Sequence, residues 1–471
     1  MEGKIPFIHL FQTPLGYYLY DVNTNDIVKI NKNTYEYLNG ENVSDKEIEN
    51  EINLLENNGY LKCTKVEETE HPATELLPFY LDSKVGQLVL QVTQNCNLRC
   101  DYCVYSGKYN TREHANKHMS FETAKKAINF LKKHSRERDT VVIGFYGGEP
   151  LLEFELIKKC VEYAQTELQG KKINYSLTTN ATLLTDEIMD YFIEYSFMIT
   201  VSIDGPKEMH DKERRFADGN RGSFDIVMSN IKRIREKNID YFNKNVRFNA
   251  VLLTDKSFQC VDQFFKGDEI FQNAGISAHL VSDAFSKQSP KVNEVFVEER
   301  QYALFKFYLA QLNRIDIKYA SPLLYNRFIQ MKNKRGYGEA HHRVSLLKKW
   351  HRGGPCIPGV LRLFVTVDEK LLPCEKVSEI ADIVQLGTLD GGFDIDKVSN
   401  ILNIEKYTME KCHNCWAYSE CSLCFHCCNN NENEIALSII KKCEQVKSEV
   451  DNIFKDYTVL QELGCDFGLE E

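Results

Sequence analysis

The sequence predicts an α/β protein whose central strands are parallel and whose two ends form smaller units. Residues 86–285 alternate apolar, strand-like runs with amphipathic helical segments six times. Such alternation predicts a parallel sheet with its functional site at the carboxyl ends of the strands. A hairpin-rich stretch precedes this region and a cysteine-rich stretch follows it. The length of 471 residues agrees with several domains, because about 150 residues per domain is usual.

The first 80 residues are expected to form a small unit followed by a linker. Apolar segments on either side of a Pro-Leu-Gly turn at 14–16 predict a β-hairpin. The linker occupies 67–81 and contains Pro72 and Pro78. The predicted strands of this unit are 8–11, 17–20 and 26–30, and its predicted helices lie near 33–39 and 44–57.

The central unit, 81–290, carries the alternation. Its predicted strands are 87–93, 140–146, 173–179, 197–203, 246–253 and 276–282. Its predicted helices include 121–135, 153–168, 186–195 and 224–237. A helical bridge at 291–350 follows, in which 294–312 is expected to turn Phe305, Phe307 and Leu309 towards the core. The last unit is 351–471.

The composition excludes several classes of protein. A formal net charge of −10 argues against a general nucleic-acid binder. No run of 18 or more apolar residues is present, so no membrane span is expected. Residues 1–6 lack the layout of a signal peptide, and we expect a cytoplasmic protein. Eleven of the sixteen cysteines fall within 96–103 and 356–428, which predicts metal ligands rather than disulfides.

The first cysteine cluster directly follows the first central strand. Cys96, Cys100 and Cys103 have Cys-x3-Cys-x2-Cys spacing in an Asn-flanked turn, and loops of this kind often carry ligand sites. A cube of four irons and four sulfides needs a ligand on each iron, so three thiolates leave one iron open. The same spacing also lies on one face of a helix, so a stripe of buried free thiols is the alternative.

A second motif, Gly147-Gly148-Glu149-Pro150, stands at the end of the second predicted strand. In this order and context, the two motifs resemble those of the radical S-adenosylmethionine (SAM) enzymes. The resemblance implies a partial (β/α)6 barrel and a [4Fe-4S] cluster whose open iron binds SAM. It also implies reductive cleavage of SAM to a radical that removes a hydrogen atom from the substrate. In such enzymes the cofactor supplies the difficult chemistry and the protein supplies placement.

The resemblance assigns roles to residues at the first three strand ends. Tyr102 would lie beside the adenine of SAM, although a loop aromatic that covers the cluster is equally expected. Gly148 and Glu149 would meet the methionine amino group, because glycine permits close approach and a carboxylate accepts charged hydrogen bonds. Asn180 belongs to a Thr-Asn-Gly motif in which Ala181 replaces the glycine.

Further candidates follow the fourth and fifth strands. By the same resemblance, Ser202 and Asp204 would lie near the ribose of SAM. Arg214 would approach the SAM carboxylate, and Arg215 competes with it on chemistry alone. Asn249 is a candidate for the same pocket, with a strand-end polar residue as its alternative.

The C-terminal cysteines form a second group. Cys356 and Cys374 flank a predicted hairpin with strands at 362–367 and 370–373, and a Cys-x2-Cys-x5-Cys-x2-Cys run begins at Cys412. The pattern resembles the SPASM extension, which carries two auxiliary [4Fe-4S] clusters and would bring the total to three. The last step departs from that pattern, being x2 rather than x3, and Glu369 stands where a glycine is expected.

The resemblance implies a ligand set for each auxiliary cluster. The inner set, nearer the barrel, would be Cys356, Cys374 and Cys424. Cys427 or Cys428 would complete it, or one iron would stay open for a substrate thiolate. The outer set would be Cys412, Cys415, Cys421 and Cys443. Zinc is the alternative metal, because paired Cys-x2-Cys units also form zinc ribbons.

The three units together resemble peptide maturases, and the Cys-Trp-Ala-Tyr run at 415–418 favours the ranthipeptide and SCIFF-type group. The resemblance implies thioether links from cysteine sulfur to carbon in a Cys-rich precursor peptide. Its leader would add as a strand to a winged-helix-like N-terminal unit, unless that unit only packs on the barrel. A flavodoxin or ferredoxin would supply electrons. The alternatives are a formylglycine-forming sulfatase maturase, a carbon–carbon cross-linking enzyme, and a zinc-bound peptide-binding protein without catalysis.

Overall fold

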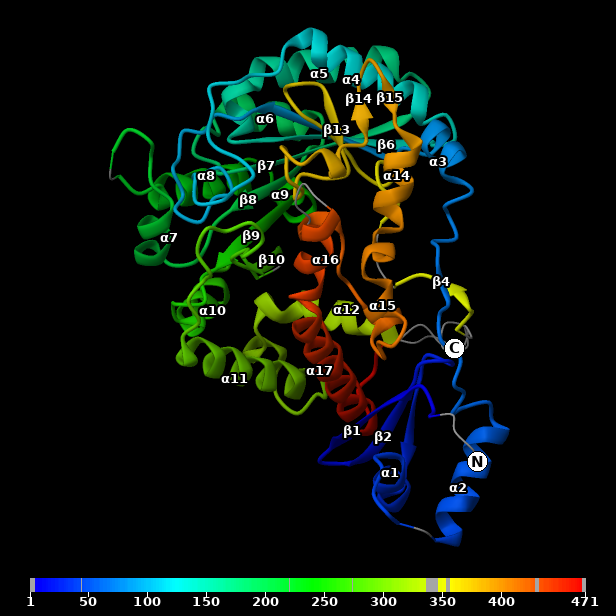
Figure 1. Ribbon diagram of the computed structural model, residues 1–471. Helices are drawn as coiled ribbons and strands as arrows, with labels where there is room; N and C mark the ends of the chain where they lie inside the picture. The colour runs from blue at the N-terminus through cyan, green and yellow to red at the C-terminus, as the bar shows by residue number, and fades with distance from the viewer. Residues whose placement is uncertain are drawn as a thin grey trace.

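The computed structural model describes residues 5–43, 45–219, 221–272, 274–335, 346–352, 356–427 and 432–467, without the side chains of residues 334, 335, 427, 432 and 433. Within these ranges, none of the helices is both long and apolar enough to cross a membrane. The large sheet and its helices lie at one end of the molecule and the N-terminal unit at the other (Figure 1). Helices α16 (Glu432–Ile440) and α17 (Cys443–Glu462) run between them.

A ten-stranded sheet forms the centre of the protein, in the order β10-β9-β8-β7-β6-β5-β12-β13-β14-β15. The first six strands in this order are parallel to one another. They are β5 (Gln87–Thr93), β6 (Thr140–Gly147), β7 (Lys172–Thr179), β8 (Met198–Ser202), β9 (Val246–Leu252) and β10 (Gly275–Leu280). All six predicted central strands are therefore confirmed. Among the strands that the structure describes, β10 pairs only with β9, so the barrel is partial.

Amphipathic helices cover the outer face of these strands. In α4 (Phe121–His134), the Ser120 hydroxyl accepts a hydrogen bond from Thr123 N, and buried Ala127, Ile128 and Leu131 face the sheet. The cap satisfies an N–H that the first turn would leave without a partner. The other helices of this layer are η1 (Pro150–Glu153), α5 (Phe154–Glu167), α6 (Asp186–Glu194), α7 (Lys207–Glu213), α8 (Phe224–Lys237), α9 (Ile239–Asn245) and α10 (Phe258–Gly267).

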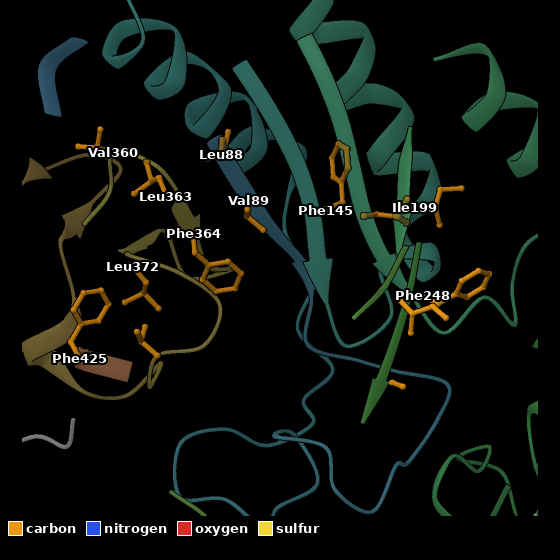
Figure 2. Close-up of a cluster of buried hydrophobic side chains, with 14 of the residues drawn as sticks. Leu88, Val89, Phe145, Ile199, Phe248, Val360, Leu363, Phe364, Leu372 and Phe425 are labelled. Atoms are coloured by element: carbon orange, nitrogen blue, oxygen red, sulfur yellow. The ribbon is translucent and has the colours of Figure 1, made fainter. Parts of the chain in front are cut away.

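The predicted C-terminal hairpin is present and extends the barrel sheet. Strand β12 (Leu363–Val365) pairs in parallel with β5, with Phe364 opposite Val89. Strand β13 (Lys370–Leu372) returns antiparallel to β12 and leads to β14 (Gly387–Thr388) and β15 (Gly392–Phe393). Figure 2 shows Phe364 and Leu372 of this hairpin beside the barrel strands that carry Val89 and Phe145. The C-terminal extension and the barrel therefore share one sheet and one core.

The N-terminal unit is a three-stranded antiparallel sheet with two helices. Its elements are β1 (Ile8–Thr13), β2 (Gly16–Asp21), β3 (Asp26–Ile30), α1 (Lys32–Leu38) and α2 (Lys46–Asn57). On one face, Leu19 packs against Ile48 and Ile52 of α2. On the other, Phe11 and Tyr20 contact Phe454 of α17. Both faces of this small sheet are thus covered.

The remaining elements connect these units. The linker strand β4 (Glu68–Thr69) pairs in parallel with β11 (Lys349–Trp350). In α11 (Glu294–Gln311), Phe307 is buried but Phe305 is 57% exposed, so the expected apolar stripe is wrong at Phe305. Residues two apart on a helix do not share a face. The others are α3 (Leu77–Ser83), η2 (Ile317–Tyr319), η3 (Pro322–Leu324), α12 (Tyr325–Arg335), η4 (Asp382–Val384), α14 (Ile395–Leu402), η5 (Ile404–Thr408), α15 (Met409–Cys412), η6 (Tyr418–Glu420) and η7 (Phe425–Cys427).

Candidate active site

A cavity of about 290 Å³ opens at the carboxyl ends of the parallel strands. Its wall includes the loop after β5 and the ends of β6, β7, β8 and β9. The structure brings ten of the residues singled out from the sequence together around it: Cys96, Cys100, Tyr102, Cys103, Gly148, Glu149, Asn180, Ser202, Arg214 and Asn249. Their roles towards SAM remain predictions.

The three early cysteines lie in a loop rather than a helix. The loop is held by Arg99 N, which donates to Arg215 O at 2.8 Å, and by Ala217 N, which donates to Asn97 O at 2.8 Å. A helical stripe of buried thiols is therefore wrong for this segment, and the three thiols instead line one cavity.

The glycines of the second motif let β6 end directly against this loop. A side chain at Gly148 would place its Cβ 2.1 Å from the Asn95 carbonyl oxygen and 3.1 Å from Cys96 Cβ. Gly147 has a φ of +148°, in the region that favours glycine. Any larger residue at 148 must therefore move the cysteine loop.

Replacing Gly148 with alanine is expected to displace the loop and lower both the iron bound at the first three cysteines and SAM binding. Anaerobic iron analysis and equilibrium dialysis with SAM measure these quantities. Gly267→Ala is the matched control, because a Cβ there meets nothing within 4 Å. A Gly148→Ala protein with unchanged iron and SAM affinity would contradict this account of the motif.

Glu149 is fully buried and holds the neighbouring strand ends together. Its Oε1 accepts hydrogen bonds from Thr179 Oγ1 at 2.7 Å and Leu151 N at 3.0 Å, and its Oε2 accepts from Asn180 N at 2.8 Å. Burial raises the pKa of Glu149 to about 7, although these hydrogen bonds favour the charged form. The carboxylate thus fixes Asn180 at the cavity as well as lining the cavity itself.

Two departures from the family patterns occur where the backbone is left-handed. Ala181 has a φ of +60° and Glu369 a φ of +63°, and both replace an expected glycine. A non-glycine residue in this region costs about 1–2 kcal/mol. Hydrogen bonds hold both positions: Ala181 O accepts from Asn230 Nδ2, and the Glu369 carboxylate accepts from Thr123 Oγ1 and Lys126 Nζ. Ala181 and Glu369 therefore adopt the left-handed backbone conformation that favours glycine.

Asp204 lies behind the cavity and positions two residues that line it. Arg214 Nε donates to Asp204 Oδ2 at 2.7 Å, and the Tyr102 hydroxyl donates to the same oxygen. Burial opposes ionisation of Asp204, but the charge and hydrogen bond of Arg214, together with His210 and the Tyr102 hydroxyl, outweigh it and hold the pKa of Asp204 below its usual value. Unlike Ser202, Asp204 is absent from the cavity wall. The expected contact with the ribose therefore fits Ser202 better than Asp204.

The structure also separates the two competing arginines. Arg214 is buried and lines the cavity, and its guanidinium carbon lies 5.4 Å from the centre of the Tyr102 ring. Arg215 instead donates from Nε to Asp211 O at 3.2 Å and is not part of the cavity wall. Arg214 is thus the arginine placed to meet a carboxylate in the cavity.

Tyr109 is a cavity residue that sequence reasoning missed. Its hydroxyl donates to Tyr102 O at 3.2 Å and to Ser282 O at 3.0 Å, which links the cysteine loop to the chain after β10. Tyr146, Leu280 and Ser282 also line the cavity. An isolated aromatic in a loop gives no motif, so only the folded chain identifies this role.

The four cysteines of the predicted outer set line a second cavity, of about 420 Å³. Cys412 ends α15, Cys443 begins α17, and Cys415 and Cys421 lie on either side of η6. Thr408 Oγ1 lies 3.2 Å from Cys412 Sγ. Arg352, which the sequence did not single out, also lines this cavity.

The described members of the predicted inner set are neighbours as well. Burial raises the pKa of the Cys356 and Cys374 thiols. The charge of Cys374 raises the pKa of Cys356 further, and the charge of Cys424 raises the pKa of Cys374 further. The side chain of Cys427 and residue Cys428 lie outside the described part of the chain. Among the side chains that are described, no three His, Cys, Asp or Glu residues form a site for a single metal ion.

Comparison with protein families gives one match in this region. Residues 90–266, from β5 to α10, match the family described as the Radical SAM superfamily. These residues are therefore similar to a radical SAM domain.

Curated relatives are similar to this chain over part of their length. The chain is 34% identical over 179 residues to an uncharacterized protein of Methanocaldococcus jannaschii, covering 38% of this chain and 57% of that protein. It is 35% identical over 171 residues to the serine-type anaerobic sulfatase-maturating enzyme of Bacteroides thetaiotaomicron, covering 36% of this chain and 40% of that enzyme. The chain thus spans between 40% and 57% of the length of these two relatives.

The fold extends beyond the matched domain. The solved structure of native anSMEcpe with bound AdoMet and Kp18Cys peptide superposes with a TM-score of 0.55 at 19% identity. The superposition covers 78% of this chain and 99% of that one, so the two proteins share a fold over most of this chain.

A radical SAM domain implies a [4Fe-4S] cluster and SAM, and the cavity residues fit both. Three thiols line the cavity, which suits a cluster with one iron left for a small molecule. Arg214 offers a cation to a carboxylate, and Glu149 offers a carboxylate to an amine.

Proposed function

We infer that this protein is a radical SAM enzyme that forms thioether links between cysteine sulfur and carbon in a ribosomally made, Cys-rich precursor peptide. One observation carries the proposal: Cys374, of the predicted inner set, follows a hairpin that joins the same sheet as the strands around the cavity. The hairpin that ends at Cys374 pairs directly with β5, the strand that leads to Cys96. Tyr146, in the cavity wall, is close enough to both Cys103 and Glu375 for their charges to raise its pKa, although burial contributes most. A thiol-rich site next to the radical site suits a cysteine substrate.

When bound, the cluster and SAM supply a carbon-centred radical that removes a hydrogen atom from a substrate C–H bond. The chain's own residues bind the cluster and SAM and enclose them in the cavity. Gly148 and Asn180 shape the wall, Arg214 meets the SAM carboxylate, and Tyr109 ties the cysteine loop to the chain after β10. Such closure excludes water from the cavity and suppresses side reactions.

The N-terminal unit is proposed to hold the leader of the precursor. Both faces of its sheet are covered, and β1 and β3 pair only with β2 among the described strands. An extended peptide can therefore add only at an edge, by β-augmentation. We accordingly assign 1–80 to leader recognition, 81–290 to the radical SAM core, 291–350 to a bridge and 351–471 to a SPASM domain with two auxiliary clusters. A cytoplasmic flavodoxin or ferredoxin is the proposed reductant.

Co-expression with a small Cys-rich peptide encoded beside this gene tests the activity. Each thioether link removes two hydrogen atoms from the peptide and one thiol from its alkylation count, and tandem mass spectrometry locates the link. A carbon–carbon link removes the same hydrogens but leaves every thiol. The competing outcome is conversion of one cysteine to formylglycine, which removes sulfur; similarity to a cysteine-type anaerobic sulfatase-maturating enzyme supports it. Either of these results would overturn the thioether proposal.

A further inference from the structure

Arg352 occupies an unusual place in the C-terminal unit. It follows β11, which is held to the linker by pairing with β4, and the preceding Trp350 O accepts a hydrogen bond from the Tyr418 hydroxyl at 3.3 Å. Its side chain is 1% exposed and lines the cavity formed by the outer cysteines. A full positive charge is therefore held inside the protein beside four thiols.

The positive charge and the N–H donors of the Arg352 guanidinium are less well balanced by neighbouring groups than a buried arginine with a purely structural role requires. Its Nε lies 3.8 Å from Glu405 Oε2, too far for a hydrogen bond. Within the described residues, none of Nε, Nη1 and Nη2 has a nitrogen or oxygen hydrogen-bond partner, and neither does Glu405 Oε2; the polar neighbour left to the guanidinium is the Cys421 thiol. Buried ion pairs are stable when their geometry is close and their remaining donors are satisfied. This pair meets neither condition, so the donors face a partner that occupies the cavity.

The surroundings indicate the chemistry of that partner. Arg352 lines the same cavity as Cys412, Cys415, Cys421 and Cys443, which places the guanidinium among the thiols. Metal-bound cysteines are thiolates, so metal loading makes the cavity wall strongly negative. The Thr408 hydroxyl lies 3.2 Å from both Cys412 Sγ and the Glu405 carbonyl oxygen, so its single hydrogen can be donated to either. Arg352 is therefore the main source of hydrogen-bond donors towards sulfur.

We propose that Arg352 donates hydrogen bonds to the sulfurs of an iron–sulfur cluster held by Cys412, Cys415, Cys421 and Cys443, and so raises its reduction potential. The inference rests on the proposed outer cluster. Reduction adds negative charge to the cluster, and a buried cation with N–H donors stabilises the reduced form more than the oxidised one. Glu405 acts in the opposite sense, because its carboxylate offsets part of the arginine charge.

An electron paramagnetic resonance titration with dithionite and redox mediators tests this. It is performed in a Cys100→Ala background, which removes the signal expected from the first cluster. Arg352→Met is expected to lower the midpoint potential of the outer cluster by at least about 59 mV, which is tenfold in a one-electron equilibrium. Arg352→Lys retains the charge and is expected to recover part of that shift. Glu405→Gln is expected to raise the potential.

Arg327→Met is the matched control. Arg327 Nη2 pairs with Asp456 Oδ2 at 2.8 Å on α17, about 20 Å beyond Cys443 at 1.5 Å per residue. Arg327→Met is expected to leave the midpoint potential of the outer cluster unchanged. An outer-cluster potential that is the same in wild type, Arg352→Met and Glu405→Gln would overturn the proposal. If Arg352→Met fails to retain iron, the direction of the potential shift in Glu405→Gln decides whether the proposal holds. Iron absent from the outer cysteines of the wild type would instead refute the outer cluster itself.

Discussion

Cys100→Ala is expected to abolish formation of 5′-deoxyadenosine from SAM under strong reductant. Cys100 lines the cavity together with the other two early cysteines and Arg214. A cluster with only two protein thiolates would leave two irons without protein ligands, so neither the cluster nor its SAM site should assemble. The chain should still fold, because this loop is held by backbone hydrogen bonds and not by the thiol.

Two measurements separate loss of the site from loss of the protein. Anaerobically reconstituted Cys100→Ala should bind less iron than the wild type by one cluster, while its thermal unfolding is nearly unchanged. Cys260→Ala is the control, because this thiol is exposed on α10 and outside the described cavities. If well-folded Cys100→Ala still produces 5′-deoxyadenosine, the assignment of the site is wrong.

Arg214→Met is expected to lower the free energy of unfolding by about 3–5 kcal/mol, because it leaves a buried carboxylate without its cation. The side chains of Arg214 and Asp204 are only 8% and 6% exposed. SAM binding should fall as well, since Arg214 is the cation of the cavity wall that we place against the SAM carboxylate. Urea denaturation under argon and equilibrium dialysis with SAM measure the two effects.

A double variant distinguishes the two roles of Arg214. Arg214→Met with Asp204→Asn removes both charges, so it should recover much of the lost stability. It should not recover SAM affinity, because the cavity still lacks its cation. Tyr102→Phe removes one hydrogen bond to the Asp204 carboxylate and should cost about 1.5–3 kcal/mol, less than Arg214→Met. Recovery of SAM affinity in the double variant would mean that Arg214 acts only through the fold.

The sequence by itself determined the local architecture of this protein. The six central strands and the helices between them follow from runs of apolar residues whose period is read within one segment. The spacing of Cys96, Cys100 and Cys103 and the Gly147-Gly148 pair are likewise short-range patterns, and the structure places them at one cavity.

Only the tertiary structure decided which distant residues meet. It joins the hairpin of β12 and β13 to β5, places Asp204 behind Arg214 rather than in the cavity, and brings Arg352 to the outer cysteines. These contacts depend on how buried faces pack and where charges find partners in the interior, and no local period of the sequence encodes either.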